Sequence, residues 1–127
     1  MNELIVVRGG GDIATGTIHR LVRCGYKVIV TEVENPSAIR RKVAFCEAVF
    51  DKEVFVDGVG CKKISSLEQA EKVFSENKAA LIVDPKCKMI DKIKPDILID
   101  GILAKKNLGT TKDMANLTIA LGPGFCA

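Results

Sequence analysis

The residue types that could do chemistry together lie near the start of the chain, in the stretch VVRGGGDIATG over residues 6–16. Gly9, Gly11 and Ala14 match the pattern G-x-G-x-x-G/A of dinucleotide-binding loops, between an apolar run and an expected helix. In that pattern the first glycine makes the turn, the second lets the backbone approach a pyrophosphate, and the third position packs helix against strand. The N–H groups at the start of the helix attract the anion. Gly9, Gly10 and Gly11 are therefore candidate nucleotide-binding residues.

Two carboxylates accompany this loop. Glu32 ends the second apolar run, where a dinucleotide-binding fold commonly places the carboxylate that binds ribose hydroxyls, so we include it in the candidate site. Asp12 follows Gly11 directly, and its charge would repel a pyrophosphate unless a cation or Arg8 intervenes. Asp12 therefore has two interpretations: it belongs to the nucleotide site, or it has a structural role, either capping the helix or pairing with Arg8. Arg8 could equally reach the anion itself.

Other positions admit a functional and a structural interpretation. Arg40, Arg41 and Lys42 follow the second strand, where the 2′-phosphate of NADP would lie, but a solvated basic helix face explains them as well. The single histidine, His19, falls opposite the expected buried face of its helix, which favours a surface or interface role over a catalytic one. The loop 103–114 offers donors and positive charge for an anion or substrate, although an exposed loop is an equal explanation; the residues concerned are Lys105, Lys106, Thr110 and Thr111. Cys126 lies in an expected loop, but no base beside it is apparent.

The composition bounds the kind of protein. The chain has 127 residues, 47% hydrophobic and 28% charged, which is typical of a single globular domain spanning 1–127. A net charge of +3 is too small to indicate a nucleic-acid partner. No apolar run is long enough for a signal peptide or a membrane span, so we expect a cytoplasmic protein. The five cysteines form no CxxC pair, which argues against a disulfide framework or a metal site.

Short apolar runs alternate with amphipathic stretches along the chain. The pattern predicts strands at 4–7, 28–32, 80–84, 96–100 and 116–121. It predicts helices at 12–24, 65–78 and 86–93, and a short helix beginning near Pro36. Residues 53–64 are expected to form a hairpin around Asp57-Gly58, at the edge of the main sheet or outside it. The predicted fold is α/β and Rossmann-like: a doubly wound, mainly parallel sheet with helices on both faces and a small β-hairpin insertion.

Three finer predictions accompany these elements. The helix 12–24 is expected to bury one face, formed by Ile13, Thr17, Leu21 and Cys24. Ser65 or Ser66 is expected to cap the helix 65–78 together with Glu68. Because ligands of such folds bind beyond the carboxyl ends of the strands, the loops after the strands should share one crevice. The chain stops one short loop after its last expected strand, so we expect it to be the N-terminal part of a longer protein.

Four stretches together resemble a known family. They are VVRGGGDIATGTIHRLVRCGYKVIVTE, NPSAIRRKVAFCEAV, KKNLGTTKDM and ALGPGF, and they resemble the YqeB-type proteins of the selenium-dependent molybdenum hydroxylase system. The resemblance covers the whole chain and implies an accessory role in maturing a molybdenum hydroxylase or its cofactor, in bacteria that oxidise purines or similar heterocycles. The family is also similar in outline to xanthine dehydrogenase accessory proteins, which carry a Rossmann-like domain. It brings no agreed catalytic set, and Cys126 stands where a small polar residue is expected.

Three functional hypotheses follow. The first is a nucleotide-binding accessory protein for hydroxylase maturation, acting through Gly9, Gly10, Gly11, Asp12 and Glu32. The second is an NAD(P)-dependent oxidoreductase, against which the lack of an acid–base pair counts. The third is a scaffold that has lost its ligand and only contacts the hydroxylase. The expected ligand is NAD(P), another nucleotide or another anionic small molecule, and the oligomeric state stays open, with a homo-oligomer among the alternatives.

Overall fold

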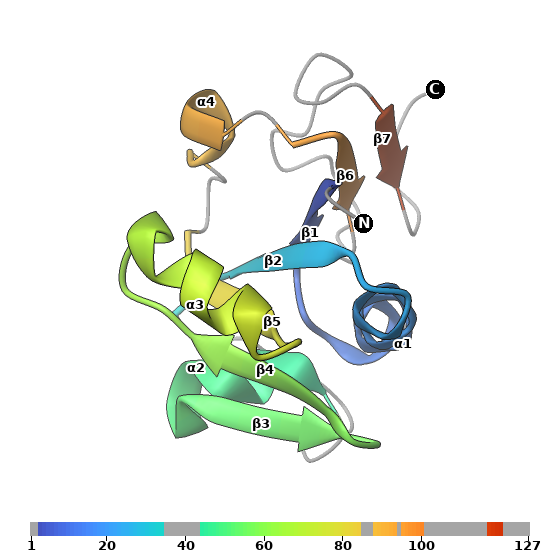
Figure 1. The fold of residues 1–127 in the computed structure, drawn as a ribbon, viewed down its shortest axis with the longest axis vertical. Helices are drawn as coiled ribbons and strands as arrows, with labels where there is room; N and C mark the ends of the chain where they lie inside the picture. The colour runs from blue at the N-terminus through green and yellow to red at the C-terminus, as the bar shows by residue number, and fades with distance from the viewer. Residues whose placement is uncertain (1–2, 35–43, 85–87, 94, 101–116, 121–127) are drawn as a thin grey trace.

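The chain forms an α/β fold around a mostly parallel sheet (Figure 1). The computed structural model describes residues 3–34, 44–84, 88–93, 95–100 and 117–120, with the backbone alone at 12, 13, 90, 91 and 117–120. The strands are β1 (Leu4–Arg8), β2 (Lys27–Glu32), β3 (Glu53–Val56), β4 (Val59–Lys63), β5 (Ala79–Val83), β6 (Ile97–Asp100) and β7 (Leu117–Ala120). The helical elements are α1 (Asp12–Arg23), η2 (Phe45–Glu47), α2 (Ala48–Asp51), η3 (Leu67–Gln69), α3 (Ala70–Ser75) and α4 (Ile90–Ile93). The strands predicted from apolar runs are therefore confirmed.

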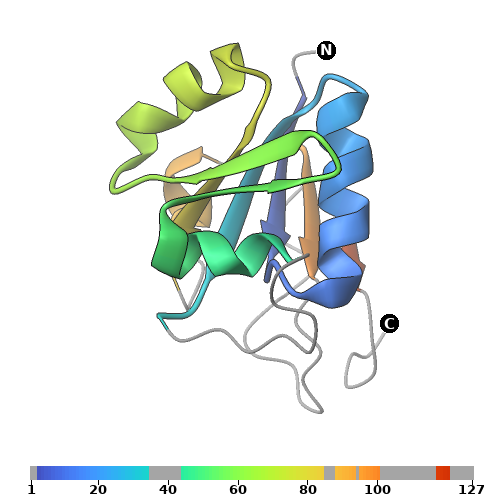
Figure 2. The same cartoon turned by 90° about the horizontal axis from the view of Figure 1, so that it is seen from below.

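The sheet has seven strands in the order β3-β4-β5-β2-β1-β6-β7. Every neighbouring pair is parallel except β3 and β4, which are antiparallel. The chain leaves β1 toward β2 on one side and later returns to place β6 on its other side, so the strand order reverses at β1. The parallel strands end at one edge of the sheet, where their arrowheads point in Figure 2. We call this the carboxyl edge.

Helical elements cover both faces of the sheet, as expected. On one face, α1 and the segment η2–α2 pack on buried side chains of β1, β2 and β5, among them Val7, Val30 and Leu81. On the other face, α3 and the residues around α4 pack on Val6, Ile29 and Leu98. Strand residues alternate between these two cores, and both sets are apolar because neither face is left to water. None of the helices in the described parts of the chain is long and apolar enough to cross a membrane.

Helix α1 ends as its sequence predicts but buries a different face. Gly25 adopts φ +91°, and its N–H and that of Tyr26 donate to the carbonyls of Val22 and Leu21, which is a Schellman motif. The buried face is formed by Ala14, Thr15, Ile18 and Val22, whereas Thr17 is half-buried and Cys24 is exposed. The prediction was right for Leu21, which packs against the core, and wrong for Cys24; the side chain of Ile13 lies outside the described residues.

Strands β3 and β4 meet at Asp57-Gly58, where both residues have positive φ (47° and 83°). β3 forms the edge of the sheet, and β4 joins it to β5. The carbonyl of Asp57 lies 3.2 Å from Nε2 of His19 and accepts a hydrogen bond from Arg23, so the turn rests on α1. His19 thus has a structural contact and no catalytic partner among the described residues.

One expectation about helix capping needs correction. Ser66 caps η3 with its backbone alone, and it is Gln69, not Glu68, whose side chain accepts the N–H of Ser65 at 2.8 Å. The one- or two-turn helix expected within 86–93 is present as the single turn α4. Elements η2 and α2 were not predicted, and the expected helix near Pro36 lies outside the described residues.

Candidate functional site

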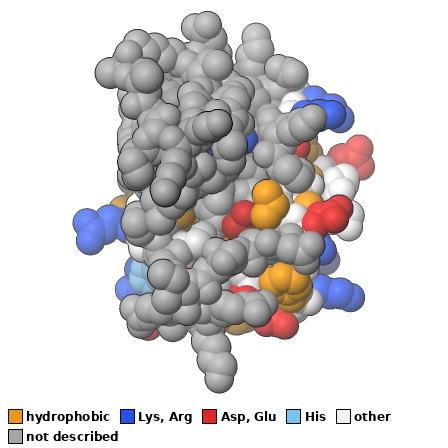
Figure 3. All heavy atoms as spheres, turned by 180° about the vertical axis from the view of Figure 1, so that it is seen from behind, with side chains coloured by type: hydrophobic (Ala, Val, Ile, Leu, Met, Phe, Trp, Pro, Cys, Tyr) orange, Lys and Arg blue, Asp and Glu red, His pale blue; other side chains and the backbone are white. Residues whose placement is uncertain are grey.

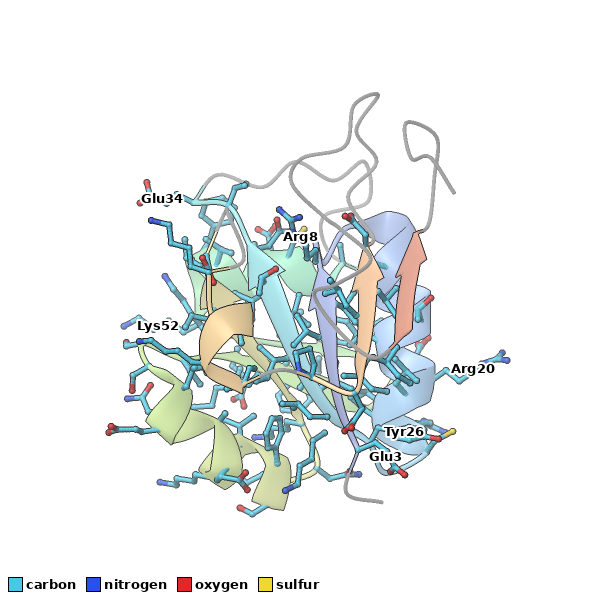
Figure 4. All side chains as sticks on the ribbon, turned by 90° about the horizontal axis from the view of Figure 1, so that it is seen from above. Glu3, Arg8, Arg20, Tyr26, Glu34 and Lys52 are labelled. Carbon is cyan, nitrogen blue, oxygen red and sulfur yellow. The ribbon has the colours of Figure 1, made fainter. Side chains whose placement is uncertain are left out.

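The predicted site residues lie together at the carboxyl edge. Gly9, Gly10 and Gly11 follow β1, and Glu32 is the last residue of the neighbouring strand β2. Figure 4 labels Arg8 and Glu34 at this edge and Glu3 and Tyr26 at the opposite one. Figure 3 looks onto the carboxyl edge. Where described residues are visible there, apolar side chains lie beside acidic ones.

The glycine loop turns sharply between β1 and α1. Gly9 adopts φ +92°, a conformation that favours glycine, and its N–H donates to the carbonyl of Thr31 at 2.7 Å. Gly11 is the N-cap of α1, with extended backbone, and its carbonyl accepts the N–H of Thr15 at 2.9 Å. The first turn of an α-helix carries N–H groups without intrahelical partners, so the loop brings anion-binding groups to the carboxyl edge.

Glu32 closes one side of this loop. Its Oε2 accepts the N–H of Gly10 at 2.9 Å, and its Oε1 accepts the N–H of Val33 at 3.1 Å. Burial raises the pKa of the Glu32 carboxyl, and the two backbone hydrogen bonds lower it by less. Each carboxylate oxygen keeps further acceptor capacity, so Glu32 can hold the loop and also accept from a ribose hydroxyl.

We predict that the pKa of Glu32 lies above its ordinary value of 4.5 in the folded protein. The folded state then holds this proton more tightly than the unfolded state. The contribution of Glu32 to stability is therefore present in full below pH 4.5 and is lost as the pH rises through the folded pKa. Carbon-13 NMR of the carboxyl group measures the midpoint directly, and Glu32→Gln should remove this part of the pH dependence of unfolding. A midpoint at or below 4.5 would contradict the prediction.

Buried hydrogen bonds that the sequence did not predict fix the inner side of the loop. The carbonyl of Gly10 accepts the N–H of Cys46 at 2.8 Å and the hydroxyl of Thr15 at 3.1 Å. The same hydroxyl oxygen accepts the N–H of Phe45 at 3.0 Å. Thr15 is buried, so it fastens the glycine loop to the segment that begins η2.

Replacing Thr15 with valine should lower the free energy of unfolding by about 1–3 kcal/mol, because the buried N–H of Phe45 loses its acceptor. Valine keeps the shape of threonine, so the loss reports the hydroxyl rather than a cavity. Urea unfolding followed by circular dichroism measures it. Thr15→Ser keeps the hydroxyl and should lose less than Thr15→Val, and an equal loss for both would argue against the hydrogen bonds.

Two neighbouring glycines of the loop face different surroundings. A Cβ atom placed on Gly10 would lie 3.0 Å from the backbone nitrogen of Cys46 and 3.3 Å from Cγ1 of Val30. A Cβ atom on Gly11 would meet no atom of the described residues within 4 Å. Gly10 is therefore needed for packing, whereas the open side of Gly11 leaves room for a ligand to approach the backbone.

Arg8 lies below this loop against Asp100. Its Nη1 is 3.9 Å from Oδ2 of Asp100, both residues are 1% exposed, and they are paired in register on β1 and β6. We expected Arg8 to pair with Asp12 or to reach an anion; the structure brings it close to Asp100, while the side chain of Asp12 lies outside the described residues. Asp12 is the first residue of α1 and Gly11 is its N-cap, so the expectation that Asp12 caps the helix is wrong by one position.

The remaining candidates do not add to this cluster. Among the described residues, no three His, Cys, Asp or Glu side chains come close enough to hold a metal ion. Cys46 and Cys61 are buried and Cys24 is exposed. Several predicted positions lie outside the described residues: Arg40, Arg41, Lys42, the loop 103–114 and Cys126.

Comparison with known proteins adds one similarity. The chain is 50% identical over 126 residues to an Escherichia coli (strain K12) protein named "Uncharacterized protein YqeB", an alignment that covers 99% of this chain. This similarity supports a YqeB-type family. The chain spans 23% of the length of that YqeB protein, so activity and partners of the whole protein are proposals. No family model and no solved structure match the chain.

Proposed function

We propose that this YqeB-type chain binds a nucleotide, NAD(P) or another, at the carboxyl edge, with the phosphates at the glycine loop and the start of α1. The observation that carries the proposal is the space that the described residues leave open at Gly11, on a loop that opens a 12-residue helix. Glu32 adds a carboxylate on the neighbouring strand, in reach of the same loop through Gly10. Ligands of open α/β sheets bind where the strand order reverses, which here is beside β1.

We also infer that the fold is Rossmann-like and doubly wound. The order β5-β2-β1-β6-β7 follows the sequence 3-2-1-4-5 of that fold if β3 and β4 are counted as a hairpin insertion. The helical cover on both faces and the parallel registers support this interpretation. The inserted strands lie beyond β5, away from the glycine loop, so they leave the proposed phosphate site intact.

For the biological role, we propose an accessory protein that matures a selenium-dependent molybdenum hydroxylase. Its support is the resemblance of the four sequence stretches to that system, together with the similarity to YqeB. Cells that lack the gene should produce the hydroxylase with a reduced molybdenum-cofactor content, measured on the purified enzyme. Full cofactor content in such cells would overturn this role and leave nucleotide binding untouched.

One observation favours the scaffold as a second candidate. The Glu32 carboxylate already accepts the N–H of Gly10, which a bound phosphate could otherwise use. If the chain only contacts the hydroxylase, the N–H of Gly10 needs no partner other than Glu32. Nucleotide titration separates the two candidates.

The deciding experiment is calorimetric titration with NAD, NADP, ATP and CTP, with and without magnesium. We expect one of them to bind wild-type protein and Gly11→Ala to weaken it about tenfold or more, because the added methyl group fills the approach to the loop. Gly16→Ala is the matched control, since a Cβ there also meets nothing within 4 Å but lies within α1. Binding of no nucleotide would favour the scaffold, and equal binding by both variants would move the site away from Gly11.

A further inference from the structure

A cavity of about 550 Å³ lies at the carboxyl edge, on the β5 side of Glu32. Its volume is in the range of pockets that hold small molecules. None of its residues was predicted to bind a ligand. The lining residues are Glu34, Val49, Phe50, Lys63, Ile64, Ser65, Ile82 and Val83.

The cavity adjoins the carboxylate of the proposed ribose site. Thr31 and Glu32 on β2 pair in register with Ile82 and Val83 on β5, and the carbonyl of Glu32 accepts the N–H of Asp84 at 2.9 Å. Neighbouring strands lie about 4.8 Å apart, so the cavity begins one strand away from the Glu32 side chain. Glu34 continues the chain from Glu32 into the cavity wall.

The opposite wall comes from elements outside the strand order of a simple dinucleotide-binding fold. Val49 and Phe50 are on α2, and Lys63, Ile64 and Ser65 end β4 and follow it. The ammonium group of Lys63 donates to the carbonyl of Val49 at 3.2 Å, which ties these two parts together. Side chains of both parts therefore form this wall, which includes Phe50, a residue that is 44% exposed.

We propose that this cavity holds the heteroaromatic base of the bound nucleotide, with the ring of Phe50 against the face of the base. The inference rests on the proposed nucleotide site and names the part of the protein that selects the base. Valine and isoleucine side chains supply an apolar slot, while Glu34, Lys63 and Ser65 offer polar groups to the edge of a base. Stacking on an aromatic ring is a usual way to bind a base, because every base has a π-face. The segment from α2 to β4 is thus the specificity element of the site.

The test compares ADP with inorganic pyrophosphate, which has the two phosphates but no base. Wild-type protein should bind ADP about tenfold or more tightly than pyrophosphate, and Phe50→Ala should remove most of that preference while leaving pyrophosphate affinity unchanged. Phe55→Ala is the matched control, since Phe55 is 57% exposed on β3 and does not line the cavity. If Phe50→Ala lowers the melting temperature, Phe50→Leu replaces it, because leucine keeps an apolar side chain without the ring.

The outcomes separate this inference from the function on which it rests. ADP preference that survives in both Phe50 variants, or is lost equally in Phe55→Ala, overturns the base site and leaves the phosphate site standing. Pyrophosphate bound as tightly as ADP by wild-type protein does the same. Failure of wild-type protein to bind either probe overturns the phosphate site and the base site together.

Discussion

Replacing Asp100 with leucine is expected to lower the free energy of unfolding by about 3–5 kcal/mol, the largest loss we predict for a single substitution. The carboxylate of Asp100 is buried beside the guanidinium of Arg8, and both residues are 1% exposed. Arginine keeps its positive charge in proteins, so the charge remains when its partner is lost. The substitution therefore removes the carboxylate of Asp100 from beside a buried guanidinium that stays charged. Urea unfolding of the wild-type and variant proteins gives the difference.

The matched control removes both charges. In the double variant Arg8→Met with Asp100→Leu, neither of the two charges remains, and apolar side chains take the place of the pair on β1 and β6. Replacing a buried ion pair in this way is often neutral or stabilising, so much of the loss should be recovered. A single variant within about 1 kcal/mol of wild type, or a double variant as unstable as the single one, would show that the pair contributes little.

The second large effect separates adjacent glycines. Gly10→Ala should cost about 1–3 kcal/mol, because its Cβ would lie 3.0 Å from the nitrogen and 3.3 Å from Cα of Cys46. The backbone atoms of Cys46 are fixed by their hydrogen bond to Gly10, so they cannot move aside as a flexible side chain can. Gly11→Ala, one residue further on, has open space and should stay within about 0.5 kcal/mol of wild type.

Thermal and urea unfolding of these two variants measure the contrast. Only a difference between them supports the described geometry, because both substitutions add the same methyl group to the same loop. Equal stability of the two variants would mean that the backbone at Cys46 yields. Loss of stability at Gly11 alone would reverse our assignment of which glycine packs and which faces a ligand.

The sequence predicts those parts of the fold that depend on local pattern. Apolar runs located the strands, and the spacing from Gly9 to Ala14 correctly indicated a tight turn from a strand into a helix. Gly25 marked the end of α1 because the left-handed conformation after a helix favours glycine. Glu32 was correctly placed beside the loop, although its observed partner is a backbone N–H and its binding of ribose stays a prediction.

What escaped prediction depends on partners that are far apart in the chain. Cys46 and Phe45 reach Gly10 and Thr15 across thirty residues or more, and no local spacing in the sequence predicts such a contact. The pairing of Arg8 with Asp100 did leave a signal. Each is a charged residue that ends an apolar strand, and strands of a parallel sheet bring their ends together. That signal becomes useful only once β1 and β6 are known to be neighbours.

The network behind the glycine loop also governs how the loop can open. The amides of Phe45 and Cys46 donate into it, one to Thr15 and one to Gly10, so neither can reach water unless the loop and η2 separate. Hydrogen exchange at these two amides should therefore proceed through one shared opening event, and not through independent fluctuations of two loops. Because these hydrogen bonds fix the buried side of the loop, the side that would face a ligand is nearly rigid. Little conformational entropy then remains to be lost when something binds there.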